Sequence, residues 1–154
     1  MPDLPNTWRD PHRQVEIPFP QALDEWAETS VPVLKDVART YGGYITYSQL
    51  ASRFFDETRI HTTGLLTRWS GRLLNRVIHL CLEQKLPALS SLVIHASDGM
   101  VGSGFDEVLR ASGKDVPGTD LERERAAAAE RLKCYREYSS DVPADAEPRL
   151  TVKY

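Results

Sequence analysis

The sequence predicts an α+β domain that is mainly helical, with a winged helix-turn-helix-like core, a small antiparallel hairpin and an added C-terminal helix. Three observations predict it. The 154 residues are 41 % hydrophobic and 27 % charged, as in an ordinary folded domain. Two short segments, 89–95 and 100–105, flank the turn signal Ser97-Asp98-Gly99 and have the β-branched and glycine content of a hairpin. Apolar residues recur at helical spacing in the segments 21–41, 47–55, 64–84 and 120–138.

The composition divides the chain into three parts. Residues 1–20 hold five prolines, which favour an extended arm because proline interrupts helices. We expect residues 21–138 to form a single globular domain. Residues 139–154 are polar and contain two prolines, so we expect a tail that at most docks on the domain.

Local signals mark the ends of the first two helical segments. Ser30 followed by Pro32 predicts a break or a kink within 21–41. Thr46 and Gln49 have the spacing of a capping box, so a short helix should begin at about Tyr47.

The segment 120–138 follows a second capping-box spacing, formed by Thr119 and Glu122. Its glutamates and arginines are interpreted as a solvated face, with the flanks of a self-association seam as the alternative. The residues expected on its buried side are Leu121, Ala128, Leu132, Tyr135 and Tyr138.

The charge distribution is uneven along the chain. The 19 basic and 22 acidic residues give a net charge of −3, which excludes an overall basic nucleic-acid-binding surface. Only the middle third, residues 41–95, has an excess of basic groups. Within it Arg68, Arg72 and Arg76 recur every four residues, so they share one helix face, which we expect to point outward.

This arginine face predicts binding to double-stranded DNA by a non-enzymatic, regulatory protein, with contacts from the helices 47–55 and 64–84 and the hairpin 97–104. In the alternatives, the arginines pair with acidic groups of the outer thirds, or they dock an acidic protein partner in an interaction module. An enzyme whose site no motif reveals is a third class. The candidate DNA-binding residues are Thr46, Tyr47, Ser48, Arg53, Thr63, Arg68, Arg72, Asn75, Arg76 and Ser103.

Three short motifs carry a resemblance to a known family. The stretch YITYSQLA (44–51), the run RWSG (68–71), and LPAL (86–89) with LVI (92–94) and Asp98-Gly99 resemble the DNA-binding domain of the alkylguanine-DNA alkyltransferases and alkyltransferase-like proteins. The resemblance covers about residues 31–109. It implies a winged-helix fold, with Tyr47 as a phosphate-contacting tyrosine and Arg68 as a finger arginine. The chain also looks like uncharacterised proteins of actinobacteria and their phages, which implies no activity.

The chain departs from the alkyltransferase pattern where that family has its nucleophile. Leu92 stands at the position of the reactive cysteine, and no His-Arg pair follows it. Because a leucine side chain cannot accept an alkyl group, alkyl transfer by this route is excluded. Cys81 lies in mid-helix without a neighbouring base in the sequence, so it does not replace the missing nucleophile.

The remaining motifs predict neither catalysis nor a cofactor. The four histidines lack metal-ligand spacing, so we expect no metal, and the glycines at 99, 102 and 104 suit a turn better than a phosphate cradle. We expect no catalytic residue and no cofactor. Without a signal peptide or a long apolar run, we expect a cytoplasmic protein with no membrane contact, as a monomer or homodimer.

Overall fold

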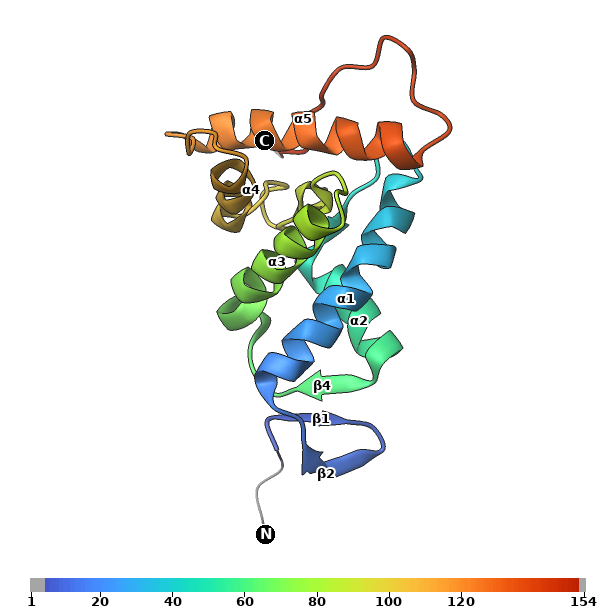
Figure 1. Ribbon diagram of the computed structural model, residues 1–154, viewed down its shortest axis with the longest axis vertical. Coiled ribbons are helices and arrows are strands. Elements are labelled where there is room, and N and C mark those ends of the chain that lie inside the picture. The colour runs from blue at the N-terminus through green and yellow to red at the C-terminus, as the bar shows by residue number, and fades with distance from the viewer. Residues whose placement is uncertain (1–4, 153–154) are drawn as a thin grey trace.

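The computed structural model describes residues 5–152 and is an α+β fold dominated by five α-helices. Helix α5 lies across one end, α1 and α3 run along the middle, and a small sheet closes the opposite end near the N-terminus (Figure 1). The elements are β1 (Thr7–Arg9), β2 (His12–Glu16), α1 (Phe19–Ala38), β3 (Ile45–Thr46), α2 (Tyr47–Thr58), β4 (Ile60–Thr62), α3 (Leu66–Glu83), the 3₁₀ turn η1 (Leu89–Leu92), β5 (Val93–Ile94), the 3₁₀ turn η2 (Ser103–Phe105), α4 (Asp106–Ala111) and α5 (Asp120–Tyr138).

The helix boundaries follow the local signals in the sequence. Helix α2 begins at Tyr47 with a complete capping box, in which Thr46 and Gln49 each bond the other's backbone. The N-cap hydroxyl of α5 is Thr119 Oγ1, which accepts from the Glu122 N–H. The helix does not break at the expected place, because α1 continues through Pro32. Ser30 does not end the helix either, since its hydroxyl donates to the Trp26 carbonyl one turn earlier.

The small antiparallel sheet confirms the expected sheet type, but it is built from other residues. Its strand order is β2-β1-β4, with Trp8 of β1 opposite His61 of β4. Residues 7–16 are extended, as the prolines predict, yet they form a hairpin that is part of this sheet. Trp8 is only 7 % exposed as a result, so the N-terminal segment contributes to the packed structure.

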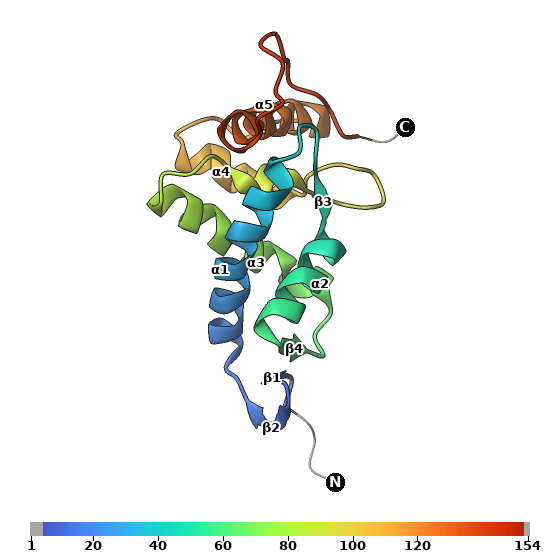
Figure 2. The ribbon, with the colours of Figure 1, turned by 90° about the vertical axis from the view of Figure 1, so that its right-hand side faces the viewer.

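The hairpin predicted over 89–105 was wrong. Residues 89–92 form the turn η1, and β5 pairs in parallel with β3, with Ile45 opposite Val93. Residues 95–102 instead form a loop, closed by two hydrogen bonds between His95 and the backbone of Gly99 and Met100. Gly99 has φ 72°, a left-handed conformation that favours glycine. Figure 2 shows this yellow loop extending on the same side as α2.

Aromatic side chains fill the core between α1, α2 and α3. Trp26 is fully buried and stacks on Phe54 of α2 and on Trp69 of α3, with ring centroids 5.4 and 4.8 Å apart. Leu73 and Val77 continue the buried stripe of α3, as their spacing predicts. This packing fixes how α3 presents its opposite, solvent-facing side.

Helix α5 closes the other end of the core with charged groups that the sequence assigned to solvent. Glu124 and Arg131 are each 1 % exposed, whereas Leu121, expected inside, is 48 % exposed. Arg131 donates to the Ser91 carbonyl at 3.1 Å and to the Arg149 carbonyl at 3.3 Å. The C-terminal segment therefore docks on α5.

Candidate nucleic-acid interface

A polar groove runs between the three-stranded sheet and the first half of α3. Its volume is about 490 Å³. Arg68 and Arg72 line it and are both exposed, and within residues 5–152 neither has a carboxylate partner within 4.0 Å. The other residues that line it are Asn6, Thr7, Glu16, Ile17, Phe19, Thr62, Thr63, Gly64 and Trp69.

The sheet and α3 together set the shape of this groove. Asn6 lies next to β1, and its amide oxygen accepts a 3.3 Å hydrogen bond from the Thr63 hydroxyl. Trp69 faces the core and donates from its indole N–H to the Gly64 carbonyl, which holds the connection between β4 and α3 against the helix. We call the groove with its two unpaired guanidinium groups the Arg68–Arg72 groove.

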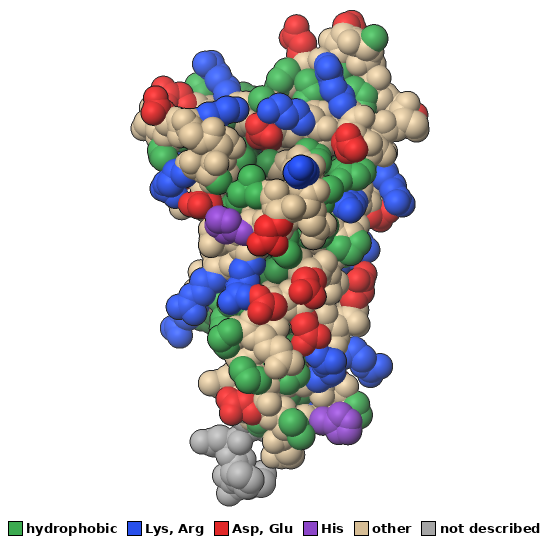
Figure 3. Space-filling view, viewed as in Figure 1, with side chains coloured by type: hydrophobic (Ala, Val, Ile, Leu, Met, Phe, Trp, Pro, Cys, Tyr) green, Lys and Arg blue, Asp and Glu red, His purple; other side chains and the backbone are tan. Residues whose placement is uncertain are grey.

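The arginine row is not open along its whole length. Arg76 forms an ion pair with Asp24 of α1, so the alternative of pairing with the acidic N-terminal third holds at this position. Asn75 lines a separate shallow pocket beside Arg76. Figure 3 shows basic side chains over the lower half of α3 and acidic side chains beside them over α1. Only the first half of α3 thus offers unpaired positive charge.

A second group of candidate residues lies where α2 begins. The Tyr47 ring stacks on the His95 ring with centroids 4.6 Å apart and planes 22° apart. Burial raises the pKa of the Tyr47 phenol, so it stays protonated at neutral pH. A Cβ at Gly102 would lie 2.9 Å from Tyr47 Oη, which explains why this position holds a glycine. We call Tyr47, His95 and Gly102 the Tyr47–His95 cluster.

The other predicted residues have different roles. Thr46 is occupied as the N-cap of α2, and Arg53 pairs weakly with Glu57 at 3.8 Å. Ser48 and Ser103 are exposed near the Tyr47–His95 cluster. The sequence did not indicate His95 as a contact residue, because the contact joins α2 to a loop about fifty positions away.

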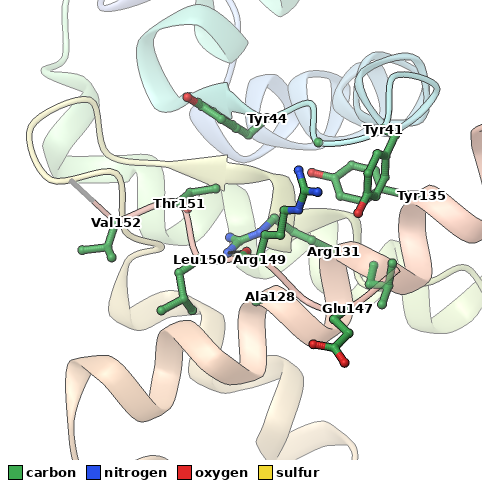
Figure 4. Close-up of a pocket in the computed structure, with 12 residues that line it drawn as sticks. Tyr41, Tyr44, Ala128, Arg131, Tyr135, Glu147, Arg149, Leu150, Thr151 and Val152 are labelled. Atoms are coloured by element: carbon green, nitrogen blue, oxygen red, sulfur yellow. Dashed lines mark hydrogen bonds between the residues drawn. The ribbon is translucent and has the colours of Figure 1, made fainter. Parts of the chain in front are cut away.

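A cavity of about 270 Å³ lies between α5, the residues 41–44 and the C-terminal segment (Figure 4). Two of its polar groups already have partners within the chain. The Tyr135 hydroxyl donates to the Gly43 carbonyl at 2.5 Å, and the Arg149 guanidinium forms a cation–π contact 5.3 Å from the centre of the Tyr41 ring. Burial raises the pKa of Tyr135 to about 12. This cavity is a docking place for the chain's own C-terminal segment.

The described part of the chain holds neither a metal-binding cluster nor a membrane-spanning helix. Residues 5–152 contain no group of three or more His, Cys, Asp or Glu side chains arranged to hold a metal ion. None of the helices within these residues combines the length and apolarity needed to cross a membrane.

Comparison with family models, with characterised proteins and with solved structures finds nothing that matches this chain.

Proposed function

We propose that the protein binds double-stranded DNA without catalysis, placing the first half of α3 against the phosphate backbone. The observation that carries the proposal is the Arg68–Arg72 groove, where two exposed guanidinium groups have no carboxylate partner among residues 5–152. Unpaired arginines gain most from phosphate, because binding releases counterions from the duplex. The hydroxyl and amide groups of Thr63 and Asn6 add hydrogen-bonding capacity beside them.

The arrangement of the helices supports a helix-turn-helix interpretation. Helices α2 and α3 follow each other with only β4 and short connections between them, and both pack on α1 through Trp26. In such a unit the second helix presents its exposed side to DNA. The loop 95–102 would take the place of a wing, since it is joined to the start of α2 by the stacking of Tyr47 on His95. The resemblance of Tyr47 and Arg68 to alkyltransferase contact residues favours the same class of ligand.

The test is fluorescence anisotropy of a labelled 20-base-pair duplex titrated with the protein between 50 and 200 mM salt. We expect affinity to fall steeply with salt, by a slope of about −0.9 per phosphate contacted. Arg68→Ala combined with Arg72→Ala should weaken binding and reduce the magnitude of the slope by about 1.8, the contribution of two contacts.

The matched control is the double variant Arg110→Ala with Arg125→Ala, which removes two exposed positive charges from α4 and α5. We expect it to bind as the unaltered protein does. Equal weakening by both double variants would mean that only net charge matters. A lack of duplex binding at low salt would overturn the proposal in favour of an acidic protein partner.

A further inference from the structure

A second cavity, of about 250 Å³, lies beside the second half of α3, at the junction of α3, η1, α4 and α5, and shares no lining residue with the Arg68–Arg72 groove. Most of its wall is apolar. Its polar members are Ser90, Ser112 and the rim residues Glu130 and Lys133. The apolar and thiol residues that line it are Ile78, Cys81, Leu82, Leu86, Pro87, Ala88 and Val108.

One polar group in this wall lacks a partner. Ser90 is 2 % exposed, and its Oγ forms no hydrogen bond within the part of the chain that the structure describes. A buried hydroxyl without a partner destabilises a fold, so native proteins rarely retain one without a reason. The second hydroxyl, Ser112 Oγ, already donates to the Val108 carbonyl at 2.8 Å. Ser90 thus offers an unused donor and an unused acceptor.

The charges at the rim of the cavity exclude charged ligands. Lys133 Nζ lies 2.9 Å from Glu130 Oε1, so the two groups neutralise each other and leave no counter-ion for a buried charge. Burial also raises the pKa of the Cys81 thiol, which keeps it uncharged at neutral pH. A ligand inside this cavity must therefore be neutral.

The volume limits the size of that ligand. A cavity of about 150 Å³ accommodates benzene, with six non-hydrogen atoms. On the same scale 250 Å³ accommodates about ten.

From these observations we infer that this cavity is a binding site for a compact neutral molecule with an apolar body and one hydroxyl group, which Ser90 Oγ recognises. A phenol with a short alkyl substituent is the simplest member of the class. Its ring would contact Ile78, Leu86 and Val108, and its hydroxyl would supply the hydrogen bond that Ser90 lacks. Such pockets, mainly apolar with few polar groups, are typical of small-molecule sites.

The experiment is a titration of the full chain with 4-ethylphenol, followed by the NMR signals of its methyl groups. We expect saturable shifts at Ile78, Leu82, Leu86 and Val108, with little change at Val33 or Leu50 in the main core. Ethylbenzene, which lacks the hydroxyl, should bind about 5- to 10-fold more weakly, as expected for one hydrogen bond.

Two serine variants distinguish hydrogen bonding of the ligand hydroxyl by Ser90 from an effect of cavity shape. Ser90→Ala should bind 4-ethylphenol and ethylbenzene equally. Ser112→Ala should keep the preference for the phenol, because the Ser112 hydroxyl already donates to the Val108 carbonyl. The melting temperature of Ser90→Ala should not fall, since the variant removes an unpartnered buried group. No saturable shift, equal binding of both probes to the unaltered protein, or an unchanged preference in Ser90→Ala would overturn the inference. None of these results depends on DNA binding.

Discussion

Replacing Trp26 by alanine is expected to be among the most damaging single changes in the molecule. The side chain is fully buried, stacks on Phe54 and Trp69, and donates from its indole N–H to the Ile60 carbonyl at 3.2 Å. Truncation of a buried tryptophan costs about 3–5 kcal/mol. The two lost aromatic pairs and the unpaired carbonyl place Trp26→Ala at about 5 kcal/mol, at the upper end of that range.

The measurements are urea unfolding and thermal melting, both monitored by far-UV circular dichroism. For a domain of this length each kcal/mol lowers the melting temperature by about 2–4 °C, so Trp26→Ala should lose about 10–20 °C. Trp26→Phe retains the stacking and should lose only about 1–2 kcal/mol, the value of the hydrogen bond to Ile60 with some volume. For both variants, the slope of the free energy of unfolding against urea concentration should equal that of the unaltered protein if unfolding stays two-state.

Trp8→Ala is the matched comparison. Trp8 is 7 % exposed, and it lies on the small terminal sheet with Arg13 stacked over its ring at 5.3 Å. We expect a loss of about 2 kcal/mol, since neighbours at the edge of the fold can close over the gap. Equal losses from Trp8→Ala and Trp26→Ala, or a loss below about 2 kcal/mol from Trp26→Ala, would refute the assignment of the core to the α1–α2–α3 interface.

Three further outcomes follow from the same structure. Thr46→Ala should cost about 1 kcal/mol in urea unfolding, because it removes the N-cap of α2, whereas Ser48→Ala at an exposed position should cost little. Arg131→Ala should cost about 3–5 kcal/mol by leaving Glu124 buried without its partner, and Glu124→Leu added to it should recover part of the loss; no recovery would contradict the pairing. Burial raises the pKa of Cys134 from 9.0 to about 12, so the unfolded chain loses this proton first and stability should fall as pH rises from about 9 toward 12. Cys134→Ala should make that fall shallower in urea midpoints measured from pH 8 to 11.

Local signals predicted the helices because the atoms that define a helix end lie within a few residues. The hydroxyl of Thr46 accepts from the N–H of Gln49, and the hydroxyl of Thr119 accepts from the N–H of Glu122. The spacing of these residues therefore predicted where α2 and α5 begin. Helix α1 continues through Pro32 because burial of neighbouring Val31 and Val33 in the core outweighs one missing backbone hydrogen bond.

Pairings between distant segments could not be predicted from local sequence signals. The strand at Thr7–Arg9 finds its partner at Ile60–Thr62, and no residue type in either strand specifies that choice. The same limit applies to the candidate site. The helical spacing correctly placed Arg68 and Arg72 on an exposed face. The ion pair between Arg76 and Asp24, however, depends on how α1 crosses α3.

The hydrogen bond from Tyr135 to the Gly43 carbonyl has a consequence for how the chain is made. It joins residues 92 positions apart, and α5 also caps η1 through Arg131. At a synthesis rate of about 5–20 residues per second, Gly43 waits about 5–20 s before its partner exists. During that interval the α1–η1 end of the nascent chain is open to water and to other chains. The newly made protein is therefore most exposed to aggregation until α5 has left the ribosome.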